Sequence, residues 1–261
     1  MMFTDFGFKN VESAVKKKLV QGVFKNVASN YDRMNDVMSG GLHRYWKDYF
    51  ISNLPIEKSA CQVLDLAGGT GDIAFGIVEN FNHLIPEITL CDLTYDMIEV
   101  GQNRAINKGI LHNLNWTVGN AESTPFEDAS FDLVTISFGL RNCTYKEKVL
   151  SDALRVLKPG GSFFCLEFSK PISRVLKQAY DCYSFSVIPK MGKLIAQDQE
   201  SYKYLVESIR KFPDQETLKN MMMDTGFIHA SYKNLTGGIV AIHKAQKITE
   251  KETIIVKSSQ F

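Results

Sequence analysis

Short apolar runs alternate with helix-spaced segments along most of the chain. Each run is too short for a buried helix and is rich in β-branched or aromatic residues, as strands covered on both faces are. The runs that predict strands are Val63–Leu66, Ile88–Asp92, Asn115–Val118, Phe131–Ser137 and Ser162–Phe168. Repeated alternation of strand and helix predicts an α/β fold, with a parallel sheet and right-handed crossovers.

The rhythm changes after the fifth run. The segment 170–212 is too long for a connector, and its aromatic and aliphatic residues suit either core packing or a cap that lines an apolar substrate tunnel. These residues are Tyr180, Tyr183, Phe185, Val187, Ile188 and Met191. A helix over Thr217–Thr225, closed by Gly226, then precedes an antiparallel hairpin, Ala230–Leu235 and Ile239–His243.

The region before the first strand predicts helices that have no strand of their own to cover. Asn10–Asn26 carries Val11, Val15, Leu19 and Val23 on one stripe, Met34, Val37 and Met38 form a second face, and an aromatic stripe starts at His43. We therefore expect residues 1–50 to form a helical cap over the open end of the site. The α/β domain follows over 51–245 with a cap insertion at 170–212, and 246–261 is a polar, flexible tail.

Two helix boundaries are marked by glycines. Ala67–Gly71 contains three glycines, so the backbone there can turn sharply and approach a ligand closely. With the strand before it and helix-spaced apolar residues after it, this loop predicts a nucleotide cradle around Gly69 and Gly71; a purely structural tight turn is the alternative. Lys158–Gly161, after a helix over Lys146–Leu157, predicts a second tight turn.

The glycine loop fits two kinds of nucleotide. Gly69–Ala74 satisfies the dinucleotide pattern G-x-G-x-x-G/A, and Asp92 follows at the expected distance, so a nicotinamide enzyme is a rival interpretation. Asp72 argues against it, because a carboxylate in the first helical turn would repel a pyrophosphate. S-adenosylmethionine instead carries a sulfonium and an ammonium, which suit carboxylates at Asp65 and Asp72.

Polar residues follow the carboxyl ends of the other predicted strands, where ligands bind in such folds. Asp92 can accept from both hydroxyls of an adenosine ribose or, alternatively, cap the next helix. Asn120 lies in a loop that could face an adenine edge, although Asn is common in turns. Arg141 comes just after Phe131–Ser137 and among apolar neighbours, where a substrate would approach.

Composition narrows the class of protein. The 261 residues fit one large domain, 44% are apolar, 23% are charged, and the net charge of +1 gives no electrostatic case for nucleic-acid binding. Five cysteines without a C-x-x-C pair suggest reduced thiols and no metal site. Without a membrane span or an export signal, the chain is predicted to be cytoplasmic.

Two long patterns carry a family resemblance. Tyr31–Trp46 contains Y-D-x-M-N-x-x-M-S-x-x-x-H-x-x-W, and Arg155–Ser169 reads RVLKPGGSFFCLEFS. Together with the glycine loop and Ser137–Asn142, they resemble the ubiquinone/menaquinone biosynthesis C-methyltransferases, which are class I enzymes dependent on S-adenosylmethionine. The resemblance runs from about Phe24 to Lys244 and is far more specific than a glycine loop.

The resemblance implies a Rossmann-like sheet of seven strands, ordered 3-2-1-4-5-7-6, with strand 7 antiparallel. It implies a polyprenyl benzoquinol or demethylmenaquinol as acceptor and no metal. The chain would contact the membrane peripherally and act as a homodimer or in a quinone-biosynthesis complex. The implied contacts with the donor S-adenosylmethionine are Thr70, Asp92, Asn120, Ala121 and Ser137.

Methylating a quinol carbon needs a phenolate held in line with the donor methyl. Arg141 is the candidate that stabilises this developing anion, and His43 titrates in the range of a general base, although a structural role is the alternative for a lone His. In-line positioning alone can supply much of the rate. A non-catalytic donor-binding module and an O-methylating enzyme are the remaining rivals, and they would differ in the caps.

Overall fold

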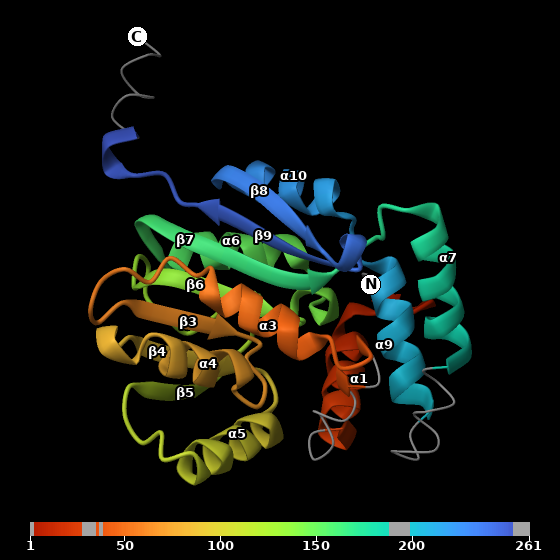
Figure 1. Ribbon diagram of the computed structural model, residues 1–261, viewed down its shortest axis with the longest axis horizontal. Coiled ribbons are helices and arrows are strands. Elements are labelled where there is room, and N and C mark those ends of the chain that lie inside the picture. The colour runs from red at the N-terminus through yellow and green to blue at the C-terminus, as the bar shows by residue number, and fades with distance from the viewer. Residues whose placement is uncertain (1–2, 28–34, 37–38, 188–198, 253–261) are drawn as a thin grey trace.

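The computed structural model describes residues 3–27, 35–36, 39–187 and 199–252. Its centre is a seven-stranded sheet of order β5-β4-β3-β6-β7-β9-β8, in which only β9 runs antiparallel to its neighbours (Figure 1). This confirms the expected strand order. The strands are β3 (Gln62–Leu66), β4 (Glu87–Asp92), β5 (Leu114–Val118), β6 (Phe131–Ser137), β7 (Leu157–Phe168), β8 (Ile228–Leu235) and β9 (Val240–Gln246).

Helices cover both faces of the sheet and make a three-layer molecule (Figure 1). The central strand β3 is buried on both sides: Val63 joins the core with one set of helices, and Leu64 joins the core with the other. The first set is α3 (His43–Ser52), α4 (Asp72–Asn80) and α5 (Tyr95–Asn107). The second is α6 (Lys146–Val156) and α10 (Gln215–Thr225), and Gly226 closes α10 at φ 109°, as predicted.

The N-terminal region differs from the prediction in two ways. A hairpin of β1 (Phe3–Phe6) and β2 (Lys9–Glu12) comes first, so α1 (Ser13–Val27) begins later than expected. The buried face of α1 carries Lys16, Val20 and Val23, whereas the predicted stripe included Val15 and Leu19, which are exposed. Of the predicted stripe only Val23 lies on the buried face of α1, because Val15 and Leu19 are exposed and Val11 belongs to β2.

The turn predicted at Lys158–Gly161 is wrong. β7 runs through it with a shift of register opposite β6, between Phe131 and Leu133. The backbone groups of its two glycines pair with Lys247, which directly follows β9. Gly160 N donates to Lys247 O at 3.1 Å, and Lys247 N donates to Gly161 O at 2.9 Å. The glycines that suggested a turn therefore lie in an irregular, bulged part of the strand, where their backbone groups are hydrogen-bonded.

The insertion after β7 is helical where it is described: α7 (Arg174–Cys182), the one-turn π-helix η4 (Tyr183–Val187) and α9 (Gln199–Lys211). Within the described ranges, no helix is both long and apolar enough to cross a bilayer. All five cysteines are free thiols. The predictions for Met34, Val37, Met38, Ile188, Met191 and the tail from residue 253 lie outside the described residues.

Candidate functional site

A large cleft opens at the carboxyl edge of the sheet, with a volume of about 760 Å³ including the part open to solvent. The loops after β3, β4, β5 and β6 form its floor and walls, as expected for a sheet of this topology. Helix α1 covers it with Lys17, Val20, Gln21 and Phe24. Gln21 also ties α1 to the floor, because its side-chain amide donates to the Leu93 carbonyl at 3.3 Å.

The glycine loop takes the backbone conformation that its sequence predicts. Gly69 (φ 57°) lines the cleft, and Gly71 (φ 92°) caps the start of α4. A Cβ at Gly71 would lie 2.8 Å from the Phe75 ring, so both its backbone angle and its surroundings require glycine. Gly71 shapes the loop without lining the cleft.

Asp92 lies in the wall of the cleft at the end of β4. One carboxylate oxygen accepts from Gly69 N at 2.9 Å and the other from Thr94 N at 2.8 Å. Burial raises the pKa of Asp92 above its usual value, against these hydrogen bonds. The backbone of Leu93 and the Thr94 side chain also hydrogen-bond to this carboxylate, which fixes the glycine loop against the start of α5.

Asn120 and Ala121 also line the cleft, in the loop after β5. The Asn120 side-chain oxygen accepts from Glu122 N at 3.2 Å, so its amide group is held in place by its own loop. The Glu122 carboxylate in turn accepts from Thr144 N at 2.7 Å and Tyr145 N at 3.1 Å. These bonds join two walls of the cleft.

A smaller polar pocket adjoins the cleft and shares Ala67 and Phe138 with it. Its lining includes Asp65, Thr70 and Ser137. Asp65 Oδ1 accepts from Thr135 Oγ1 at 2.8 Å, but Asp65 Oδ2 and Ser137 Oγ are buried and have no hydrogen-bond partner in the described part of the chain. Buried polar atoms without partners are costly, so this pocket is built to receive a polar group.

Asp65 is the most perturbed acid in this pocket. Its side chain is fully buried, and burial raises the pKa of Asp65 to about 7. The nearby Asp92 acts in the same direction, while the Thr135 hydroxyl opposes it. A cation placed beside this carboxylate would therefore be strongly favoured, because it would relieve both effects.

Asp72 has a different role from the predicted one. It forms ion pairs with Lys47 Nζ at 2.6 Å and Arg104 Nη2 at 2.8 Å. Burial alone would raise its pKa, but these two cations bring the pKa of Asp72 down to about 2. Its charge is thus compensated by protein groups, so the argument that Asp72 repels a pyrophosphate is wrong, and Asp65 is the carboxylate left open to a cationic ligand.

Thr70 is held by the same network. Arg104 Nη1 donates to the Thr70 hydroxyl at 2.7 Å and to its carbonyl at 3.2 Å. Lys47 comes from α3, so the region before β3 reaches Asp72, the first residue after the glycine loop. Sequence reasoning missed Lys47 and Arg104, because a Lys or Arg in a polar helix carries no signal of its distant partner.

Arg141 is buried against Glu167. Its Nη1 donates to Glu167 Oε1 at 2.7 Å and to the Phe138 carbonyl at 2.6 Å, and the guanidinium lies 5.3 Å from the Phe168 ring centroid. Asn142 and Cys143 beside it line the large cleft, whereas Arg141 itself lines a different cavity. The structure therefore places Arg141 next to the site and paired with a carboxylate.

His43 lies at the start of α3 and is buried. Its Nε2 is 3.0 Å from Asp36 Oδ1, and Nδ1 has no partner within the described ranges. Burial, and then the charge of Lys47, lower the pKa of His43. It is not among the described residues that line the cleft or the polar pocket.

Comparison of the sequence with known proteins gives one family over most of the chain. The sequence model of the ubiE/COQ5 methyltransferase family matches residues 11–247. A protein of Shewanella woodyi named "Ubiquinone/menaquinone biosynthesis C-methyltransferase UbiE" is 52% identical over 247 residues, covering 94% of this chain and 96% of that protein. Its namesake in Francisella tularensis subsp. novicida is 52% identical over 244 residues, with coverage of 94% and 97%.

Solved structures of far lower identity share the fold. A methyltransferase of Aquifex aeolicus described as SAM-dependent gives a TM-score of 0.56 at 14% identity, covering 91% of this chain and 100% of that one. The [4+2]-cyclase SpnF gives 0.60 at 14% identity, covering 90% and 96%. Because a cyclase shares this fold, the fold alone does not specify methyl transfer.

Proposed function

The chain belongs to the ubiE/COQ5 methyltransferase family, and on that basis we propose that it is an S-adenosylmethionine-dependent C-methyltransferase acting on the ring of a polyprenyl benzoquinol or demethylmenaquinol. The observation that carries the proposal is the pairing of the two cavities. The large cleft with Asp92 in its wall adjoins a small pocket with two buried oxygens, Asp65 Oδ2 and Ser137 Oγ, that have no hydrogen-bond partner among the described residues.

The residues fit the two ends of that donor. Asp92, Asn120, Ala121 and Gly69 would surround the adenosine, and the Asp92 carboxylate in the cleft wall would accept from the ribose hydroxyls. The polar pocket would take the methionyl end, where its ammonium would meet Asp65 and its other polar atoms Ser137. The donor supplies an electrophilic methyl group on a sulfonium, and Ala67 and Phe138, common to both cavities, would flank it.

We propose roles for Arg141 and His43, although neither is among the described residues that line the cleft or the polar pocket. The Arg141 guanidinium is paired with Glu167, so stabilising an acceptor phenolate would require it to share or exchange that partner. The lowered pKa of His43 keeps it neutral near pH 7, as a general base must be, and its Nδ1 is free to accept a proton. We propose Arg141 as the group that stabilises the anion and His43 as the base.

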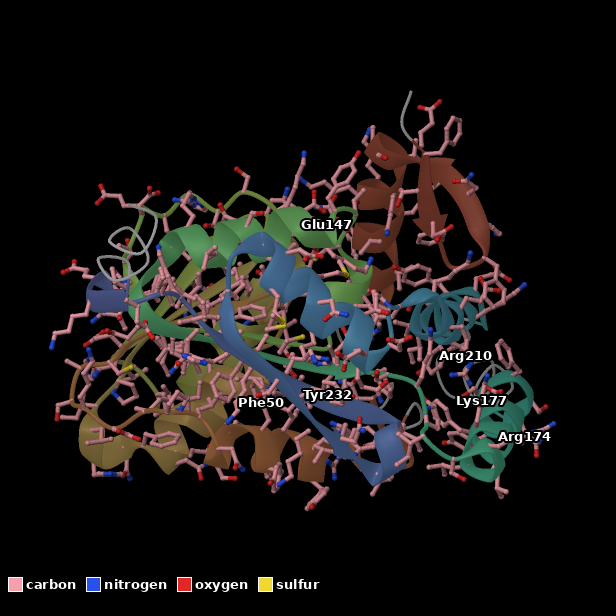
Figure 2. All side chains as sticks on the ribbon, turned by 90° about the horizontal axis from the view of Figure 1, so that it is seen from above. Phe50, Glu147, Arg174, Lys177, Arg210 and Tyr232 are labelled. Atoms are coloured by element: carbon pink, nitrogen blue, oxygen red, sulfur yellow. The ribbon has the colours of Figure 1, made fainter. Side chains whose placement is uncertain are left out.

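The cap segments support an apolar acceptor. Residues 1–50 contribute α1 over the cleft and Lys47 to the polar pocket, and we propose that they and the insertion 170–212 form the cap of a domain spanning 51–245. The insertion carries exposed apolar side chains at Ile172 (71%) and Val175 (75%). Val175 lies on α7, as do Arg174 and Lys177 at the edge of the molecule (Figure 2), and Ile172 lies just before this helix.

This combination of apolar and basic side chains on α7 suits the surface of an anionic membrane, from which a polyprenyl quinol would be drawn. We therefore propose a cytoplasmic protein in peripheral contact with the membrane, acting as a homodimer or within a quinone-biosynthesis complex.

The decisive experiment is a methyl-transfer assay with defined acceptors. The protein is incubated with methyl-labelled S-adenosylmethionine and, separately, a demethylated benzoquinol and a demethylmenaquinol, and products are identified by mass spectrometry. A label on a ring carbon supports the proposal, and a label on oxygen would identify an O-methylating enzyme instead. Binding of S-adenosylhomocysteine without any turnover would leave only a donor-binding module.

A titration calorimetry comparison separates the nicotinamide alternative. We expect S-adenosylhomocysteine to bind, because Asp65 offers a carboxylate to its ammonium group. We expect NADH not to bind, because the same carboxylate offers nothing to its second nucleotide. Tight NADH binding would contradict the proposal.

A further inference from the structure

A third cavity borders the turn η3 (Leu140–Asn142), and none of its described lining residues belongs to the cleft or the polar pocket. Its volume is about 380 Å³, including the part open to solvent. Four cationic side chains from four elements line it: Lys16 of α1, Arg141 of η3, Lys146 of α6 and Lys211 of α9. The carboxylate among its described lining residues is Asp5, on β1.

Lys16 is the buried centre of this cluster. It is 3% exposed, and its ammonium donates to the Cys143 carbonyl at 3.2 Å, but no ion pair joins it to a carboxylate within the described ranges. Burial and then the charge of Lys146 lower the pKa of Lys16 to about 8. A buried ammonium with a cation as its neighbour is costly unless an anion joins it.

The sequence alone would class Lys16 as a surface residue, because it starts the run Lys16-Lys17-Lys18. Lys17 and Lys18 are indeed exposed, while Lys16 shares the buried face of α1 with Val20 and Val23. A lysine placed among the buried residues of an amphipathic helix indicates a specific requirement for charge at that point.

The other charges of the cavity are unevenly compensated. Arg141 is paired with Glu167 at 2.7 Å, and Lys211 lies 3.6 Å from Asp5. Lys146 lies 6.0 Å from the Phe212 ring centroid and has no carboxylate partner among the described residues. Within the described ranges neither Lys16 nor Lys146 forms an ion pair, although Asp5 and Glu122 lie close enough to raise the pKa of Lys16, and Arg141 Nε is buried without a hydrogen-bond partner.

We propose that the cavity between Lys16, Lys146 and Arg141 binds a doubly charged oxyanion of the phosphate type. A phosphate dianion would supply counter-charge to the two ammonium groups that form no ion pair within the described ranges, and its oxygens can accept from ammonium and guanidinium N–H groups. The same chemistry is presented by free phosphate and by the phosphomonoester headgroup of phosphatidic acid. The site goes beyond the proposed methyl transfer and can be tested without it.

The test measures the binding of inorganic phosphate to the full chain by titration calorimetry near pH 7. Potassium chloride keeps the ionic strength constant. Lys16→Met and Lys146→Met each remove one charge and keep most of the aliphatic stem. We expect each to weaken binding by about tenfold or more, the scale of one lost charge-assisted hydrogen bond. The matched control is Lys148→Met, on the same helix, whose ammonium lies over the Tyr145 ring and outside the cavity.

The outcomes are distinct. Phosphate binding that is lost in the two cavity variants and kept in Lys148→Met establishes the site for a free anion. If inorganic phosphate fails to bind, flotation with phosphatidylcholine vesicles containing phosphatidic acid assigns the site to a lipid headgroup, provided the cavity variants lose that binding relative to Lys148→Met. Binding of neither probe, or equal effects of all three substitutions, overturns the proposal. Lys146 is the first residue of α6, so its replacement by Met should leave the fold intact. Lys146→Met therefore still tests the site if Lys16→Met fails to fold.

Discussion

Asp65→Asn should stabilise the donor-free protein at neutral pH, although it removes a residue of the proposed site. The Asp65 carboxyl is fully buried, and one of its oxygens has no partner. Its pKa rises from 3.8 in the unfolded chain to about 7 in the fold. The folded state therefore holds the proton more tightly, so stability is highest below pH 4 and declines as pH rises towards 7.

The size of the effect follows from that window. Between pH 5 and pH 7 the ionised form is favoured only in the unfolded chain, and two pH units at about 1.4 kcal/mol each give about 3 kcal/mol of lost stability. Asn cannot ionise, so the variant escapes this loss. Its new amide can be left without a partner, at a cost of roughly 1–3 kcal/mol, but that cost is the same at both pH values.

The assay is urea denaturation of wild type and Asp65→Asn at pH 5 and pH 8. The free energy of unfolding of the variant, relative to wild type, should increase by about 3 kcal/mol between the two pH values. Glu99→Gln, an exposed carboxylate on α5, is the control and should show no such change. An equal difference at pH 5 and pH 8 would refute the reasoning, since Asp65 would then ionise as freely in the fold as outside it.

The same variant should bind S-adenosylhomocysteine more weakly at pH 8, because the ammonium of the ligand would lose its carboxylate. A variant that is both more stable and a weaker binder would show that the isolated charge is kept for the ligand at the expense of stability. Unchanged affinity would mean that Asp65 is merely a buried acid.

Three further outcomes are expected. Asp92→Ala should weaken donor binding by about 2–4 kcal/mol, because the donor loses two charge-assisted hydrogen bonds. If calorimetry shows an unchanged Kd in a folded variant, Asp92 serves only to anchor Gly69 N and Thr94 N. Arg141→Ala should lower kcat by about 10²–10³ with donor affinity within about twofold, and Lys should rescue only part. Its thermal stability should fall as well, because the variant leaves Glu167 buried without its cation, so an equal fall in donor affinity and turnover is the result that would assign Arg141 a purely structural role. Sedimentation with quinone-containing vesicles should show weak binding that survives moderate salt, and Val175→Asp on α7 should abolish it, whereas release of the wild type at modest ionic strength would argue against an apolar contact.

Local patterns determined much of this protein. Strands buried on both faces require continuous apolar runs, so β3 and β6 were readable from the sequence, and the order of the sheet followed from the family resemblance. The positive φ angles of Gly69 and Gly71 are a property that only glycine supplies cheaply, so the loop was also predictable. The position of Asp92 was predictable too, because the apolar run that forms β4 ends at this residue.

Tertiary structure decided which charges are paired. Asp65 and Asp72 look equivalent in the sequence, but Lys47 and Arg104, from two other helices, neutralise only Asp72. The sequence suggested that Lys16 is exposed, but it is buried and close to Lys146. Arg141, which follows β6, pairs with Glu167 of the neighbouring strand β7. A charge interacts through space, over distances that bear no relation to separation along the chain, so the sequence could identify the ionisable groups, and only the fold could determine which of them lack a partner and are left for a ligand.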